Sequence, residues 1–224
     1  MNWFNKLLTS TLGRKLLMAL TGLFLILFLV VHLIGNLQLL KDDNGEAFNV
    51  YAKFMTSNPV IKTISYVNYA CFIIHALWAL FLTIGNRRAR GTQSYAVIKN
   101  SSPWTSRSMG ILGTLILIFL VIHLKTFWYE MHWGGIPTVN YDGEEVKDLY
   151  ATVAMAYSSL WYVVLYVFSM LILAFHLWHG FVSSFQTLGL NHPKYNPLIA
   201  FVGKAFAIIV PALFALIPIW MFLD

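Results

Sequence analysis

Four histidines lie inside strongly apolar stretches of this sequence, where a polar side chain needs a specific reason to occur. They are His32, His75, His123 and His176. An imidazole in hydrocarbon costs free energy unless it is paired or ligated, and imidazole is a common ligand of metal ions and of haem iron. A single histidine of this kind is more often a packed or hydrogen-bonded interhelical residue. Four of them need a common explanation.

The stretches that carry these histidines are long enough to cross a lipid bilayer. The chain has 224 residues, of which 58% are hydrophobic and 11% charged, whereas soluble domains carry roughly 25% charged residues. A bilayer core needs about 20 apolar helical residues per crossing. Five stretches meet that length, near residues 16–40, 61–84, 109–129, 157–185 and 198–223. The sequence therefore predicts an all-α integral membrane bundle, formed by one domain over residues 1–224.

The basic residues predict how this bundle is oriented. With a cytoplasmic N-terminus and an outside C-terminus, ten Lys and Arg residues fall on the inner side and five on the outer side, as the positive-inside rule requires. All nine acidic residues then fall outside. The basic connection over residues 86–107 is either a topology determinant beside anionic lipid or a docking surface for a soluble partner. No nucleic-acid partner is expected.

Residue counting places the four histidines at two depths. At about 1.5 Å per residue, His32 and His123 lie roughly 25 Å and roughly 21 Å from the inner boundary. His75 and His176 each lie roughly 16 Å from it. Two axial ligands of one haem must lie at nearly the same level on facing helices, so the pattern predicts an outer haem held by the first pair and an inner haem held by the second. Iron with two histidine ligands transfers electrons and does not bind oxygen.

Other metal chemistry fits this pattern less well. The sequence has no CxxCH motif, so the two haems would be b-type haems without covalent attachment. Ligands divided between two depths cannot close one tetrahedral zinc site. His179 lies three residues after His176, on a neighbouring face of the same helix, and either of the two could ligate. His132 and His192 fall in predicted loops, where we expect solvated side chains.

Five stretches of sequence resemble a known family of membrane proteins. They are TGLFLILFLVVHL, EAFNVYAKFMTSNP, IIHALW, VIHLKTFW and FHLWHGFVSSFQTLGL. The chain is similar in these stretches to the cytochrome b membrane anchor of succinate:quinone oxidoreductases, in the single-subunit form with five helices and two haems. The resemblance covers four of the five expected helices and their order.

The resemblance implies a function, partners and a location. The chain would be the membrane subunit of a succinate dehydrogenase or fumarate reductase in a bacterial cytoplasmic membrane. It would anchor a flavoprotein subunit and an iron-sulfur subunit on the cytoplasmic side and pass electrons to or from a membrane quinone, menaquinone. The dicarboxylate site would lie in the other subunits. The family places the ligand of the fourth helix four residues before one glycine and thirteen before another, which here are Gly180 and Gly189, and this spacing selects His176.

The sequence departs from some relatives at a proton-handling position. Ala174 stands two residues before His176, where some family members have a glutamate associated with transmembrane proton transfer. That proton pathway is therefore not expected here. Glu46 is the nearest candidate for an acid beside an outer quinone site, although a solvated loop acid explains it better. Glycines of the ligand-bearing helices, Gly35 and Gly113 among them, are expected to serve helix packing first and haem contact second.

Two other functions are compatible with histidines inside a membrane. One is the cytochrome b subunit of a membrane hydrogenase, formate dehydrogenase or nitrate reductase, whose histidine placement is less similar to this sequence. The other is a transporter or proton channel with a histidine relay, which needs no haem. Haem content distinguishes the second alternative from the main hypothesis.

Overall fold

The computed structural model describes residues 2, 5, 8–91 and 104–224. Within these residues, five helices are long and apolar enough to cross a membrane, namely Thr11–Leu40, Pro59–Ala89, Trp104–Trp133, Leu160–Thr187 and Asn196–Leu223. The predicted helical membrane bundle is thus confirmed. The first span begins five residues before its predicted start, and the second and third extend by two to five residues at each end. Lys6, Lys99 and residues 92–103 of the basic connection lie outside the described residues.

The spans begin where the sequence supplies helix-capping groups. The Ser10 hydroxyl accepts a hydrogen bond from the Gly13 amide at the start of the first span, and the Asn58 side chain accepts one from the Val60 amide at the start of the second. Both caps satisfy amides that have no partner within the helix. The helical elements of the spans are α2 (Thr11–Asn36), η1 (Leu37–Leu40), α4 (Pro59–Arg90), α5 (Trp104–His123), the π-helical turn η2 (Leu124–Tyr129), α6 (Glu130–Trp133), α8 (Leu160–Thr187) and α9 (Asn196–Leu223).

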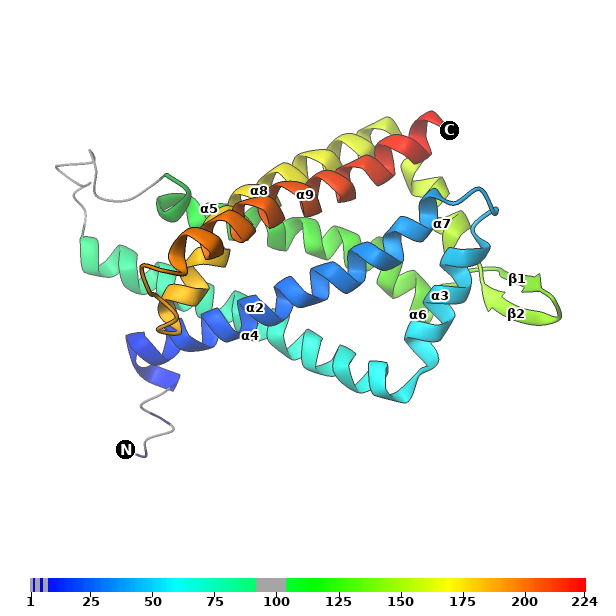
Figure 1. The fold of residues 1–224 in the computed structure, drawn as a ribbon. Coiled ribbons are helices and arrows are strands. Elements are labelled where there is room, and N and C mark those ends of the chain that lie inside the picture. The colour runs from blue at the N-terminus through cyan, green and yellow to red at the C-terminus, as the bar shows by residue number, and fades with distance from the viewer. Residues whose placement is uncertain (1, 3–4, 6–7, 92–103) are drawn as a thin grey trace.

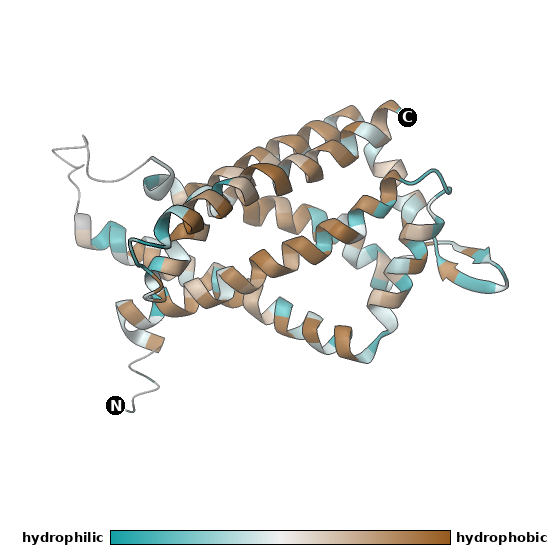
Figure 2. Ribbon diagram, in the orientation of Figure 1, coloured by the Kyte–Doolittle hydropathy of each residue, from teal (hydrophilic) through white to brown (hydrophobic). Residues whose placement is uncertain are grey.

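Four of the five spans form a ring, and the fifth packs on its outside. Helix α2 packs against α4 and α8, α5 packs against α8 and, less extensively, against α4, and α9 lies along α8 (Figure 1). In this ring α2 faces α5 across one diagonal, and α4 faces α8 across the other. The helical surfaces are brown with apolar residues along most of their length, whereas polar residues concentrate towards the two ends (Figure 2). Side chains on the diagonals therefore meet in the interior of an apolar bundle.

The end of the bundle away from the N-terminus carries structure that the sequence did not predict. Residues 41–58 and 132–147 were expected to be loops, but they contain α3 (Glu46–Ser57) and an antiparallel hairpin of β1 (Thr138–Tyr141) and β2 (Glu144–Lys147). A further helix, α7 (Leu149–Tyr157), ends at the residue where the fourth span was predicted to begin. We refer to this end, with α3, α6, α7 and the hairpin, as the hairpin end (Figure 1).

Asn49 holds the hairpin end together. Its side chain is 1% exposed, and its amide nitrogen donates to the Asp148 carboxylate at 3.0 Å and to the Tyr141 hydroxyl at 3.1 Å. Its carbonyl oxygen accepts from the Tyr150 amide at 2.9 Å. Asp148 also caps α7 by accepting from the Ala151 amide. One buried amide side chain thus joins α3 to β1 and to the start of α7.

We expect Asn49→Ala to destabilise the hairpin end strongly. The substitution leaves the partly buried Tyr150 amide without its acceptor, and leaving such a polar group unsatisfied costs about 1–3 kcal/mol. Thermal unfolding of the purified chain should show a clearly lower midpoint. Asn86→Ala, the same chemical change at an exposed position of α4, is the matched control and should leave the midpoint unchanged. An equal midpoint for both variants would contradict the role assigned to Asn49.

Candidate functional site

The first pair of histidines meets across one diagonal of the bundle. His32 of α2 and His123 of α5 have ring centres 5.8 Å apart, with the ring planes at 87°. Two imidazoles that bind one metal ion from opposite sides, each with a nitrogen about 2 Å from the metal, have ring centres about 6 Å apart. The separation of His32 and His123 therefore suits a shared metal ion.

The second pair meets across the other diagonal. His75 of α4 and His176 of α8 have ring centres 6.4 Å apart, with the ring planes at 64°. Each of the four helices of the ring thus contributes one imidazole, and each imidazole faces the helix diagonally opposite in the ring. The structure brings together the same two pairs that residue counting proposed.

The two pairs lie about 15 Å apart along the bundle. The backbone of Gly22 lies against His75, and His32 follows ten residues later in α2. In α5, Gly113 lies against His176, and His123 also follows ten residues later. Ten residues of α-helix correspond to about 15 Å. Residue counting had given a separation of only roughly 5–9 Å, because it measured the depths of His32 and His123 from Lys15 and Met109, whereas α2 begins at Thr11 and α5 at Trp104.

Thr21 fixes one nitrogen of the His75 ring. The Thr21 hydroxyl donates to the Leu17 carbonyl at 2.7 Å and lies 3.1 Å from His75 Nδ1. Because the hydroxyl proton is used by the carbonyl, the hydroxyl oxygen can accept a hydrogen bond from an N–H group at Nδ1. His75 then carries its proton on Nδ1, and the lone pair of Nε2 is free to bind a metal. A hydrogen bond of this kind is a regular feature of metal-ligating histidines.

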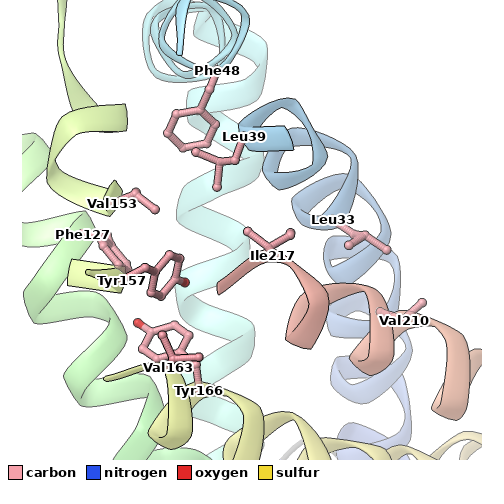
Figure 3. Packing of buried hydrophobic residues seen from close by; sticks show 10 residues of the cluster. All are labelled: Leu33, Leu39, Phe48, Phe127, Val153, Tyr157, Val163, Tyr166, Val210 and Ile217. Atoms are coloured by element: carbon pink, nitrogen blue, oxygen red, sulfur yellow. The ribbon is translucent and has the colours of Figure 1, made fainter. Parts of the chain in front are cut away.

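Tyr166 has the corresponding place beside His123. Its hydroxyl lies 3.2 Å from His123 Nδ1, and its ring belongs to an aromatic cluster with Phe127 and Tyr157 at the hairpin end of α8 (Figure 3). Burial raises the pKa of the Tyr157 phenol well above its usual range, so the cluster contains a neutral hydroxyl there. Tyr162 stacks on Tyr166 and hydrogen bonds to Thr126.

The histidines without such a partner are also informative. His176 Nδ1 is buried and has no hydrogen-bond partner among the described residues. A buried polar atom without a hydrogen-bond partner costs free energy unless a bound group pairs with it. Among the described residues, the only polar partner of the His32 ring nitrogens is the Asn36 amide nitrogen of the same helix, 3.4 Å from each, and the ring stacks on Phe28. The imidazoles of these two residues are therefore held mainly by packing.

Two glycines allow the backbones of α2 and α5 to lie close to the rings of the second pair. A Cβ atom at Gly22 would lie 3.3 Å from His75 Cε1, which is closer than ordinary contact, and one at Gly113 would lie 3.9 Å from His176 Cε1. Gly35 serves a different purpose, because the Tyr51 ring of α3 packs directly on its backbone. The donor set, the paired rings and the glycine beside each imidazole of the second pair together fit a planar group ligated from both sides.

The remaining sequence candidates lie outside these pairs. His179 is half-buried on α8, and no ring contact joins it to another histidine in the described part of the chain. His132 of α6 packs on Trp128 of η2, and His192 packs on Tyr195 before α9. Glu46 is exposed in the first turn of α3, where a carboxylate favours the positive end of the helix dipole.

Sequence reasoning did not find Thr21, Tyr166 or the role of Gly22. Their contacts join residues on different helices, which no local pattern reveals. One signal was present in the sequence: Gly22 and His32, Gly113 and His123, and Tyr166 and His176 are each ten residues apart. Equal spacing on three helices indicates two sites at a constant separation.

The described residues contain no group of three or more His, Cys, Asp or Glu side chains that could hold a metal ion, so the histidine pairs do not form a protein-only zinc site. Comparison with known proteins found no matching family model, no matching curated protein and no matching solved structure.

Proposed function

We propose that this chain is the cytochrome b membrane anchor of a succinate:quinone oxidoreductase and binds two b-type haems. The observation that supports this most is the meeting of four imidazoles as two pairs, on the two diagonals of one helix ring and about 15 Å apart along it. Two bis-histidine sites at two levels suit electron transfer across a membrane. The resemblance of five sequence stretches to this family supports the choice of complex.

Each side chain of the two pairs has a defined task in this proposal. His32 and His123 would hold one iron, and His75 and His176 the other. Bound haem would supply one-electron transfer. Thr21 and Tyr166 fix the orientation of His75 and His123 through Nδ1, while the apolar faces of the helices exclude water from both pairs. In the absence of a carboxylate at Ala174, the chain has no acid beside His176 to carry a proton.

The N-terminal end of the bundle is proposed to face the cytoplasm and to dock the soluble subunits. The described basic residues there include Arg14, Lys15, Arg87, Arg88 and Lys194, whereas the nine acidic residues of the chain all lie towards the hairpin end (Figure 1). This distribution follows the positive-inside rule for a bacterial cytoplasmic membrane. A flavoprotein and an iron-sulfur subunit would then contact the end nearer to His75 and His176, and menaquinone would exchange electrons within the membrane.

Two measurements test the proposal. The purified chain should show a reduced-minus-oxidised spectrum with a b-type alpha band and two haems per chain. Mild purification from the native membrane should recover a flavoprotein and an iron-sulfur protein with succinate dehydrogenase or fumarate reductase activity. A chain without haem would contradict the proposal and favour a histidine-relay transporter. Two haems with a hydrogenase, formate dehydrogenase or nitrate reductase as the recovered partner would favour another redox complex.

Tyr166→Phe is expected to raise the midpoint potential of the haem held by His32 and His123. Loss of the phenol oxygen removes the acceptor for His123 Nδ1, which makes the imidazole a weaker donor and destabilises the oxidised iron. A hydrogen bond worth about 0.5–1.5 kcal/mol corresponds to roughly 20–60 mV for one electron. Tyr157→Phe removes a phenol from the same cluster that hydrogen bonds to neither His123 nor Tyr166, and redox titration should show no shift. Equal potentials in wild type and Tyr166→Phe would refute this role.

A further inference from the structure

A pocket of about 370 Å³ opens at the hairpin end, and basic side chains dominate its wall. Lys53 and Thr56 come from α3, Lys62 from the first turn of α4, His132 from α6, and Glu145 and Lys147 from β2. We call this the lysine pocket. Its walls come from elements that are up to about 90 residues apart in sequence, so only the folded hairpin end creates it.

The lysine pocket has a surplus of positive charge. Lys53, Lys62 and Lys147 face one acidic lining residue, Glu145, which leaves a surplus of two positive charges. Lys53 is partly neutralised, because its ammonium lies 2.6 Å from the Glu144 carboxylate beside the pocket. Counting Glu144 as well, a surplus of one remains. The ligand that this wall favours is an anion.

Two of the lysines keep donors available for such an anion. Lys147 donates to the neutral Met131 carbonyl at 2.6 Å, which leaves its charge unpaired and further N–H groups free, since an ammonium has three. The Lys62 ammonium makes no hydrogen bond or ion pair with any described residue, and the side chain is exposed. An anion oxygen between Lys62 and Lys147 would therefore find charge that the protein itself does not neutralise.

The pocket lies at the depth of lipid headgroups. Lys62 stands four residues into the second span, and His132 stands one residue before the end of the third. Trp128 lies four residues before His132, and the ring centres of the two side chains are 4.7 Å apart. The Trp128 indole N–H donates to the Tyr69 hydroxyl at 2.8 Å. Tryptophan and tyrosine gather at the membrane–water boundary. A ligand in the pocket could thus keep its charge in the pocket and its apolar part in the bilayer.

We propose that the lysine pocket binds the phosphate of an anionic phospholipid headgroup, with Lys62 and Lys147 as the main donors. On the face of α4 that carries Lys62, the exposed side chains of Tyr66 and Ile73 provide a surface for an acyl chain further into the span. Basic pockets between membrane helices are common sites for anionic lipid. The inference does not depend on haem and holds for either orientation of the bundle.

Lipid binding to the full chain in neutral detergent tests this inference. Native mass spectrometry with added phosphatidylglycerol should show one lipid retained in preference to phosphatidylcholine. The double variant Lys62→Gln with Lys147→Gln should bind phosphatidylglycerol about thirtyfold more weakly, since each lysine near an anionic surface contributes about a factor of five. A control that removes two charges outside the pocket, Lys41→Gln with Lys194→Gln, should bind as the wild type does.

Other outcomes of the same experiment would overturn the assignment. Equal retention of phosphatidylcholine, or equal affinity in the double variant, would show that the pocket does not select anionic lipid. Displacement of the lipid by inorganic phosphate at equal concentration would identify a site for free phosphate. Lys62→Gln alone breaks no hydrogen bond or ion pair with a described residue and should weaken binding about fivefold. This single variant therefore tests the proposal even if the Lys147 variant does not fold.

Discussion

Under the proposed assignment of two haems, replacing His123 by alanine is expected to reduce the haem content from two per chain to one. The remaining haem will be the one held by His75 and His176, because those rings lie about 15 Å away along the bundle and share no contact with His123. His176→Ala will remove the other haem and leave the pair of His32 and His123. Haem quantification and redox titration of the two variants should therefore show complementary single components.

The histidine next to the second pair provides the control for this experiment. His179→Ala should retain both haems, since the ring of His176, and not that of His179, contacts His75. Loss of a haem from His179→Ala together with an intact His176→Ala variant would reverse the choice of ligand. Loss of both haems from either His123→Ala or His176→Ala, in a chain that still folds, would contradict two independent sites.

The sequence predicted the membrane spans and the pairing of histidines because both depend on local composition and on helical rise. An apolar run of about 20 residues specifies a span whatever lies elsewhere in the chain. Rise per residue then converts positions within spans into relative depths. Both steps need only the approximate ends of each helix. The predicted pairs are therefore the same as the observed ones, although the predicted ends differ from the observed ends by several residues.

The hairpin end could not be predicted in the same way. Its helix α3 depends on the Asp43 side chain, which accepts from the Gly45 and Ala47 amides, and on Asn49, whose partner Asp148 lies 99 residues later. Contacts of that range leave no periodic trace in the sequence. The residues 138–147 likewise form a hairpin whose buried contact, Val139 opposite Val146, is a single cross-strand pair. Such a short polar strand pair has too weak a pattern to be distinguished from a loop.

The spacing between the pairs was underestimated for a related reason. Basic side chains mark where the chain meets water, but a helix can begin before that boundary, as α2 does four residues before Lys15. Depth measured from the first charged residue is therefore a poor reference. Contacts across helices, such as Gly22 with His75, give the level of each pair directly.

Gly22→Leu is expected to abolish the haem held by His75 and His176. Even a Cβ atom at residue 22 would lie 3.3 Å from His75 Cε1, and the three further carbons of leucine must occupy space next to the ring. Because α2 and α4 pack closely here, the imidazole has to turn away from His176. We expect haem content near one per chain, with the potential of the remaining haem matching that of the His176→Ala variant.

Two other glycines make this test specific. Gly85→Leu places the same side chain on an exposed part of α4 with no atom within 4 Å of its Cβ, and it should keep both haems. Gly113→Ala should also keep both, since its Cβ would lie at an ordinary contact distance of 3.9 Å from His176. If Gly22→Leu retained two haems with unchanged potentials, the backbone of α2 would not limit the position of His75. The close approach at Gly22 would then serve helix packing alone, and the second site would depend on Thr21 for the orientation of its ligand.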